Sequence, residues 1–235
     1  MPIYKICDIP VSMQPKYEPL LSQSKPYLYD CAVSPAITIE PEESFLIKKA
    51  KRNNYPSTDI CEYVTVGSLF YRKLLNFNGF LLHSSAIEYE NKAYVFSAPC
   101  GTGKSTHTKL WIDHFGKDKV KYINDDKPAL MIKDNKCIVC GTPFSGKTNL
   151  NSDISVELQA ICFIYRSEKN EIRKCSTKKA IKYILEQTLK SVNADGMCKL
   201  LTMIDTLLKN YPVYEMGCNI SDEAVSVAYN AMKGN

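Results

Sequence analysis

Apolar and polar residues are arranged along this chain in segments that predict strands and helices in turn. Short runs rich in β-branched and aromatic residues are typical of strands, and longer runs with apolar residues three or four positions apart are typical of helices. The order of these segments predicts an α/β protein with a mixed sheet. Strands are expected at residues 80–89, 92–97, 120–123, 129–133, 136–140, 158–165, 171–174 and 212–216, and helices at residues 57–76, 104–115, 177–191, 196–210 and 221–232.

Two pairs of these strands are expected to form hairpins. Glu90-Asn91 joins one pair, as suits a tight hairpin turn, and Asp134-Asn135 joins the other. In the helix at residues 57–76, the apolar candidates for the buried stripe are Val64, Leu69, Leu74 and Leu75.

The first part of the chain is the least regular. Frequent prolines rule out long helices over residues 1–58. Residues 27–33 and 36–39 are short strand candidates, and residues 42–54 form a polar segment. We therefore expect a small β-rich N-terminal unit at residues 1–58, followed by a main domain at residues 59–235.

The most informative stretch is VFSAPCGTGKS at residues 95–105, which lies between a predicted strand and a predicted helix. Glycines allow close approach of the backbone to phosphate oxygens, and the amides at the start of the helix attract the same anion. Lys104 would then contact the β/γ-phosphates, and the Ser105 hydroxyl would bind Mg²⁺. A simple glycine-rich turn would leave both residues without a role. The expected nucleotide-binding set is Ala98, Pro99, Cys100, Gly101, Thr102, Gly103, Lys104, Ser105 and Thr106.

This loop departs from the phosphate-loop consensus at Ala98, which occupies the position of the usual first glycine. Alanine is tolerated there if φ is negative and is costly if φ is positive. Cys100 lies within the loop, so we expect alkylation of its thiol to block nucleotide binding.

Asp125 and Asp126 follow the strand predicted at residues 120–123. Ligands of open α/β sheets bind at the C-terminal ends of strands, and an acid just downstream of a phosphate loop is typical of a Mg²⁺ ligand. The sequence NDDKP also suits an ordinary turn with solvated acids. The segment GTPFSGK at residues 141–147 supplies Lys147, although a solvated turn is the simpler interpretation of it.

Composition adds few constraints. The chain has 235 residues, a net charge of +5 and scattered basic residues, so neither nucleic acid nor a membrane is an expected partner. The N-terminus lacks an apolar signal core and no apolar run is long enough to span a membrane, which predicts a cytoplasmic protein. The ten cysteines are expected to be reduced and largely buried. Cys137 and Cys140 have a metal-like spacing, but in a strand they would point to opposite faces.

Four segments taken together resemble the kinase domain of HPr kinase/phosphorylase. They are LHSSA at 82–86, FSAPCGTGKSTH at 96–107, NDDKPA at 124–129 and GTPFSGK at 141–147. The resemblance covers about residues 60–232 and is closer to the small stand-alone relatives of that enzyme, including kinases that phosphorylate peptide hydroxyls. It implies a P-loop kinase core of the type shared with phosphoenolpyruvate carboxykinase.

The resemblance also implies roles for single residues. Asp125 matches the catalytic acid/base, Asp126 lies near the metal, and His83 matches a histidine beside the catalytic aspartate. The opposite assignment of the base and metal roles to Asp125 and Asp126 stays open. Lys147 matches a lysine that contacts the transferred phosphate or the acceptor. Taken alone, His83 is equally typical of a hydrogen-bonded core histidine. Because no segment for docking HPr is recognisable, HPr is not the expected acceptor.

The expected function is an ATP- and Mg²⁺-dependent kinase that phosphorylates a hydroxyl group, with serine the leading acceptor. The acceptor belongs to a peptide, a protein or a small molecule such as free serine, and the sequence leaves open whether the chain forms a homo-oligomer. The alternatives are a non-catalytic ATP-binding switch or scaffold, and a carboxykinase suggested by fold kinship alone.

Overall fold

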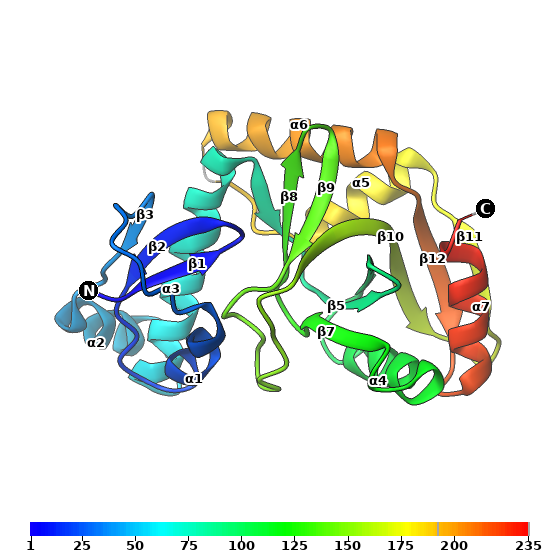
Figure 1. Cartoon of the computed structure of the whole chain (residues 1–235), viewed down its shortest axis with the longest axis horizontal. Coiled ribbons are helices and arrows are strands. Elements are labelled where there is room, and N and C mark those ends of the chain that lie inside the picture. Colours follow the sequence, from blue (N-terminus) through cyan, green and yellow to red (C-terminus); the bar gives the residue numbers. More distant parts are fainter. Residues whose placement is uncertain (192, 235) are drawn as a thin grey trace.

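A curled mixed sheet forms the centre of the molecule in the computed structural model, which describes residues 1–191 and 193–234 (Figure 1). Its strands follow the order β4-β8-β9-β10-β6-β5-β7, and β12 lies beside β10 with β11 at the outer edge of β12. The strands are β4 (Gly79–Leu81), β5 (Ser84–Tyr89), β6 (Lys92–Ser97), β7 (Val120–Asn124), β8 (Ala129–Lys133), β9 (Lys136–Cys140), β10 (Ser155–Arg166), β11 (Glu171–Lys174) and β12 (Val213–Cys218).

The long strand β10 holds the sheet together. Its first residues pair with β9 in antiparallel fashion, whereas its later residues pair in parallel with β6 on one side and β12 on the other. Residues 160–164 of β10 are buried on both faces, as expected for a strand in the middle of a covered parallel sheet. The predicted α/β class with a mixed sheet is therefore confirmed.

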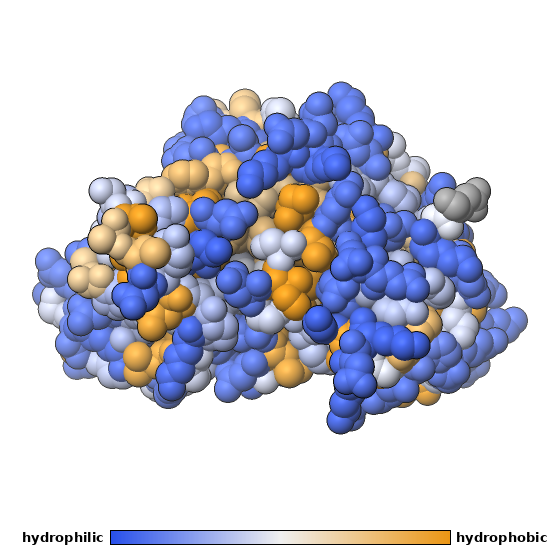
Figure 2. All heavy atoms as spheres, viewed as in Figure 1, coloured by the Kyte–Doolittle hydropathy of each residue, from blue (hydrophilic) through white to orange (hydrophobic). Residues whose placement is uncertain are grey.

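Helices cover both faces of this sheet, and most of the outer surface on the side shown in Figure 2 is hydrophilic. On one face Tyr94 and Phe96 of β6 pack with α4 (Lys104–Phe115) and α7 (Asp222–Met232), around the fully buried Trp111. On the other face Ala93 and Val95 of the same strand pack with α5 (Thr177–Glu186) and α6 (Ala194–Asn210). The alternation of side chains along a strand accounts for this division.

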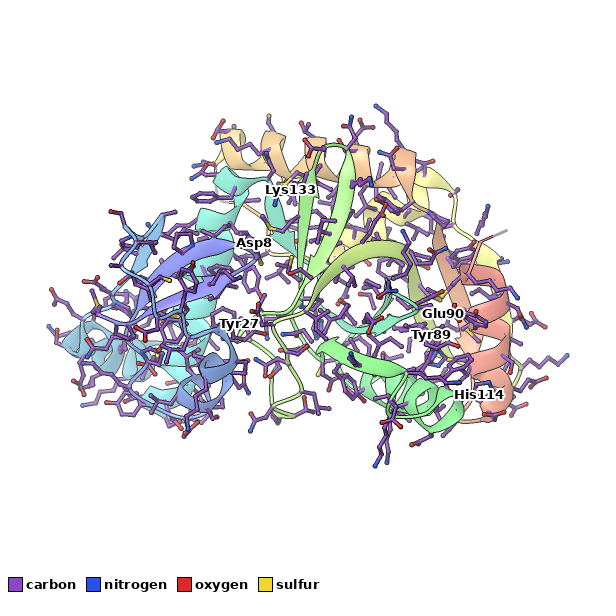
Figure 3. All side chains as sticks on the ribbon, viewed as in Figure 1. Asp8, Tyr27, Tyr89, Glu90, His114 and Lys133 are labelled. Atoms are coloured by element: carbon purple, nitrogen blue, oxygen red, sulfur yellow. The ribbon has the colours of Figure 1, made fainter. Side chains whose placement is uncertain are left out.

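Polar contacts hold α4, α7 and the first hairpin together at one end of the molecule. His114 on α4 pairs with Asp222 at the start of α7, and the Tyr229 hydroxyl donates to Glu90 at 3.2 Å (Figure 3). Glu90 and Asn91 have φ values of 54° and 59°, and Asp134 and Asn135 have values of 50° and 60°. Both predicted hairpin turns are therefore confirmed.

The N-terminal part adds a three-stranded sheet and three helices. The strands are β1 (Ile3–Ile6), β2 (Ile9–Met13) and β3 (Ile37–Ile39), and the helices are α1 (Leu20–Ser24), α2 (Glu43–Arg52) and α3 (Thr58–Leu74). Ile6, Val11 and Ile39 share one hydrophobic cluster with Phe70 of α3 and Phe144, so the N-terminal strands pack directly on the rest of the molecule. The division of the chain at residue 58 stays a prediction.

Several element predictions were wrong in this N-terminal region. Residues 27–33 form no strand, and the strands β1 and β2 were missed. Their connecting turn uses Cys7 and Asp8 at φ values of 57° and 62°, and neither residue is a strong signal for such a turn. The polar segment at 42–54 contains the helix α2.

In α3 the predicted stripe is correct at Leu74 but wrong at Val64, which is 37% exposed. The helix predicted at 177–191 ends at Glu186.

The strand predicted at 80–89 is two strands. β4 pairs with β8, whereas β5 pairs with β6 and β7, and the chain passes from one group to the other at Leu82-His83. At this break the His83 amide donates to the carbonyl of Gln187 at 2.7 Å, and the Ser84 amide donates to the carbonyl of Asp126 at 3.0 Å.

Candidate active site

The segment after β6 has the backbone of a phosphate-binding loop. Gly101 and Gly103 have φ values of 77° and 126°, and a Cβ atom at either position would meet no other atom within 4 Å. Conformation rather than space therefore requires glycine at both positions. The helix α4 starts at Lys104, and the amides of its first turn have no acceptor within the helix. The loop and helix thus present backbone N–H groups to an anion.

The conformation of Ala98 and the position of the Lys104 side chain are the two features of this loop that its sequence left undetermined. Ala98 is not among the residues with positive φ, so the replacement of the consensus glycine causes no backbone strain. The Lys104 ammonium group donates to the Ala98 carbonyl at 3.0 Å, and the Lys104 side chain is folded over the loop. Burial lowers the pKa of Lys104, while the negative charges of Asp126 and Asp125 oppose the shift.

The acidic doublet lies at the same edge of the sheet. Both β6 and β7 run antiparallel to β5, which lies between them, so β6 and β7 share a direction and end at the same edge of the sheet. Asn124, which is fully buried, fixes the turn that follows β7. Its Oδ1 accepts hydrogen bonds from the amides of Asp126 and Lys127 at 2.9 and 2.7 Å, and its Nδ2 donates to the carbonyl of Thr142 at 2.8 Å. This side chain therefore joins the doublet to the loop at residues 141–149.

Asp125 points toward the nucleotide loop side of the site. Its Oδ1 accepts a hydrogen bond from the Ser85 hydroxyl at 2.6 Å, and Ser85 in turn lies 2.8 Å from the Thr108 hydroxyl of α4. The second oxygen, Oδ2, is buried and has no hydrogen-bond partner among the described residues. A buried carboxylate oxygen without a partner is costly, and it fits a site for a hydrated cation beside Ser105.

Asp126 has different neighbours. Its Oδ1 lies 3.2 Å from Nε2 of His83, and its other oxygen pairs with the Lys127 ammonium group. The His83 ring is held on its far side by Gln187, whose Oε1 lies 2.9 Å from Nδ1. Burial favours the neutral acid, but the hydrogen bond from His83 and the charge of Lys127 outweigh it, so the pKa of Asp126 is lowered.

The position of His83 corrects one expectation. The resemblance predicted this histidine beside Asp125, whereas the ring contacts Asp126, the second carboxylate of the doublet. The break between β4 and β5 explains the placement, because the chain leaves the strand ladder at this residue. Both interpretations weighed for His83 describe it in part, since the ring is hydrogen-bonded and also lines the cleft.

The loop at residues 141–149 closes the other side of the site. Gly146 has a φ of 70° and lies against the Asp126 side chain, so that a Cβ atom there would approach the carboxylate to 3.1 Å. Ser145 is buried, and its hydroxyl has no hydrogen-bond partner in the described part of the chain. Lys147 is exposed at the rim of the cleft. The segment GTPFSGKT at 141–148 matches the phosphate-loop consensus by letters, but no helix follows it, so it lacks the structure of such a loop.

These groups line one cleft of about 850 Å³ that contains Lys104, Ser105, both aspartates, His83 and Lys147. A second pocket of about 380 Å³ adjoins it across Gly101 and Gly103. The second pocket lies between α4 and the C-terminal ends of β10 and β12, where Arg166 donates to the carbonyls of Gly101 and Thr102 at 2.6 and 3.2 Å. Both volumes are in the range of small-molecule sites.

Other residues considered from the sequence lie outside the cleft. His107 is buried against Phe96 and accepts a hydrogen bond from the Trp111 indole at 3.3 Å, and its burial lowers the pKa to about 4. Cys137 and Cys140 belong to different hydrophobic clusters, as the strand geometry predicted. Five of the ten cysteines, all of them free thiols, are buried, whereas Cys100 is exposed and, unlike these residues, lines the cleft. Within residues 1–191 and 193–234 no group of three or more His, Cys, Asp or Glu side chains could hold a metal ion by itself.

Sequence reasoning missed several residues that build this site. Asn124 was noticed only as part of the motif, although an Asn before two acids is a known signal for a side chain that binds nearby amides. Ser85 and Gln187 carry no such signal, because their roles depend on the packing of distant segments.

Comparison with known proteins adds a distant fold likeness. No protein-family model matches the sequence, and no curated protein matches it. Among solved structures, the HPr(Ser) kinase/phosphatase from Coxiella burnetii is similar, with 10% sequence identity and a TM-score of 0.38, over 66% of this chain and 99% of that one. A likeness of this size transfers no residue role to the chain. None of the helices in the described ranges is long and apolar enough to cross a membrane.

Proposed function

We propose that the protein is a kinase that transfers the γ-phosphoryl group of ATP to a hydroxyl group with the help of Mg²⁺. One observation carries the proposal. The amides at the start of α4, the Lys104 ammonium group and two carboxylates with different neighbours all line a single cleft. Phosphoryl transfer requires this combination of phosphate binding, charge neutralisation, a cation site and a group that orients the attacking oxygen.

The two adjoining pockets suit the two halves of a nucleotide. The phosphates would lie against residues 100–106 in the larger cleft, and the nucleoside would lie in the pocket between α4 and the ends of β10 and β12. The apolar side chains of Leu110, Ile164 and Ile220 line this second pocket and offer contacts for a base. Its position at the C-terminal ends of parallel strands is typical of ligand sites in α/β sheets.

The neighbours of the two acids support a division of roles that reverses the assignment implied by the resemblance. Asp125 has a buried oxygen without a partner on the side of α4, so we assign it, with Ser105, to the cation. When bound, Mg²⁺ would neutralise the charge of the β- and γ-phosphates. Asp126 faces His83 and the loop that bears Lys147, so we assign it to the acceptor.

In the proposed step the acceptor oxygen forms a bond to the γ-phosphorus, and the bond from that phosphorus to the β,γ-bridging oxygen breaks. Asp126 orients the hydroxyl and takes its proton, while ADP leaves with the bonding electron pair. The lowered pKa makes Asp126 a weak base, which suits a loose transition state that asks for orientation more than for early proton removal. Lys104 and Lys147 would neutralise charge on the transferred group.

The experiment for this function is incubation of the protein with Mg-ATP and a panel of hydroxyl acceptors. The panel contains serine-containing peptides, proteins and free serine, and the product measured is ADP together with the phosphorylated acceptor. Acceptor-dependent ADP is the expected result. Nucleotide binding without transfer to any acceptor would instead favour the switch or scaffold. The departure from the phosphate-loop consensus at Ala98 would favour this alternative, but the φ of Ala98 is not positive, so the departure does not strain the loop.

A further inference from the structure

The N-terminal segment reaches the cleft through a buried glutamine. Gln23 on α1 is 1% exposed, and its amide group makes hydrogen bonds to the loop at residues 145–149. Its Nε2 donates to the carbonyl of Gly146 at 2.9 Å and to Oδ1 of Asn149 at 2.7 Å, and its Oε1 accepts from the amide of Ser145 at 3.1 Å. One side chain thus satisfies backbone groups of two consecutive residues in this loop.

Tyr63 of α3 completes the arrangement. Its hydroxyl donates to Oε1 of Gln23 at 3.1 Å and accepts from the amide of Gly146 at 2.8 Å. The ring is buried, which raises the pKa of Tyr63, and the Lys127 ammonium group lies 5.9 Å from its centre. We call Gln23 and Tyr63, with the backbone of residues 145 and 146, the clamp.

The position of α1 is itself fixed by buried contacts. The carboxylate of Glu62, 2% exposed, accepts hydrogen bonds from the amides of Lys16 and Tyr17, both at 3.0 Å. The hydroxyl of Tyr27, which Figure 3 labels where the N-terminal part meets the loop, donates to the carbonyl of Ser152 at 3.0 Å. Because the segment at residues 16–27 is held at both ends, it fixes the position of Gln23 and, through Gln23, the loop at residues 145–149.

The clamp acts on the acceptor side of the cleft. Gly146 is pressed against Asp126, so the position of residue 146 determines the space beside that carboxylate. The unpartnered Ser145 hydroxyl and Lys147 belong to the same loop, and Pro19, Ile60 and Tyr63 form the adjacent wall. None of the hydrogen bonds of the clamp involves residues 98–106, so the nucleotide side is independent of it.

We propose that Gln23 is a positioning residue for phosphoryl transfer: together with Tyr63 it fixes the loop at 145–149 beside Asp126, and the N-terminal segment forms the acceptor wall of the site. This inference rests on the proposed function. It explains why residues 1–39, which show no chemistry of their own in the sequence, pack so closely on the main sheet.

The test compares Gln23→Met, which keeps the volume but loses every hydrogen bond, with Gln14→Met, an exposed glutamine of the same segment. Both are measured in the full chain by amide hydrogen exchange over residues 144–150, by binding of a fluorescent ATP analogue and by acceptor-dependent turnover. For Gln23→Met we expect faster exchange at residues 145 and 146, a fall of about tenfold or more in kcat/KM for the acceptor, and nucleotide affinity within about twofold of wild type. Gln14→Met should match wild type in all three.

Several results would overturn the inference. Unchanged exchange in Gln23→Met would show that the clamp does not hold the loop, and an equal loss of nucleotide affinity would show a general structural effect. A normal kcat/KM with faster exchange would remove the role in transfer. Tyr63→Phe, which keeps the ring, must also show faster exchange at residues 145 and 146 and a lower kcat/KM for the acceptor with unchanged nucleotide affinity, with smaller changes than in Gln23→Met. If Gln23→Met does not fold, the result for Tyr63→Phe tests the inference in its place. If wild type transfers phosphate to no acceptor, the proposed function fails and the acceptor role fails with it, whereas the exchange measurement still tests the clamp.

Discussion

Replacing Asp126 with asparagine tests whether this carboxylate, and not Asp125, acts on the acceptor hydroxyl. The substitution keeps the shape of the side chain, so the close contact with Gly146 is preserved, but it removes the charge that faces His83 and Lys127. Loss of a group that accepts the acceptor proton lowers turnover by about 10²- to 10⁴-fold. This range corresponds to about 3–5 kcal/mol of barrier. The Ser85–Asp125 hydrogen bond and the amides of α4 are untouched, so the affinity for nucleotide should stay within about threefold of wild type.

The pH dependence of kcat/KM provides an independent test of the role assigned to Asp126. Because His83 and Lys127 lower the pKa of Asp126, this acid is ionised well into the acid range, and the acid limb of kcat/KM should lie below the ordinary range of an aspartate. His83→Ala removes a hydrogen bond that favours the ionised form. The pKa of Asp126 then rises, and the acid limb should move to higher pH in this variant.

Asp126→Asn is compared with Asp125→Asn as the matched control. Both variants are assayed by steady-state ADP release at saturating acceptor and by titration with a fluorescent ATP analogue. Asp125→Asn should weaken the Mg²⁺ dependence of nucleotide binding, which Asp126→Asn leaves intact. The reasoning is refuted if Asp126→Asn retains turnover while Asp125→Asn loses it with unchanged Mg-ATP affinity, because the acceptor role would then belong to Asp125.

Three further predictions concern the scaffold and the phosphate loop. Asn124→Ala leaves the amides of Asp126 and Lys127 without their acceptor, so we expect a loss of about 2–4 kcal/mol in the free energy of unfolding by urea denaturation. The exposed Asn230→Ala should change it by less than about 0.5 kcal/mol. Gly103→Ala places a side chain at a φ of 126° in the phosphate loop, and Gly116→Ala places one at a φ of 99° outside the cleft. Both variants should lower the free energy of unfolding by about 1–2 kcal/mol. Only Gly103→Ala should also weaken binding of an ATP analogue, by about tenfold or more. Alkylation of Cys100, in a chain whose exposed Cys31 and Cys198 are replaced by serine, should block nucleotide binding and be slowed by bound ATP; full affinity after complete modification would exclude Cys100 from the site.

The parts of the site that were predictable from sequence are those built by consecutive residues. The glycine pair, Lys104 and the start of α4 are adjacent in the chain, and local conformation alone determines their arrangement. The same holds for the hairpin turns at Glu90-Asn91 and Asp134-Asn135, in which Asn91, Asp134 and Asn135 are residue types that tolerate the required positive φ.

The missed parts depend on which distant segments meet. The run at residues 80–89 looks like one strand because no glycine or proline interrupts it, and only the presence of different partner strands, β8 for the first part and β6 and β7 for the second, splits it at His83. Val64 fits the apolar period of α3 but is 37% exposed, because no other segment covers it fully. Gln23 lies in a proline-rich stretch without periodicity, and the loop it binds is more than a hundred residues away in the chain. No local pattern contains such information.

The different surroundings of Asp125 and Asp126 follow from the turn after β7. Asn124 accepts hydrogen bonds from the amides of Asp126 and Lys127, and in the resulting turn the two adjacent acids have different neighbours. Asp125 turns toward Ser85 and α4, where the nucleotide loop begins, and Asp126 turns toward His83 and Gly146. In the proposed mechanism, two acids that are adjacent in the sequence would thus serve as a cation ligand and an acceptor group without a second acidic strand. Because the clamp touches only the Asp126 side, we expect changes in residues 1–39 to alter the proposed acceptor half of the site and to leave the proposed nucleotide half unchanged.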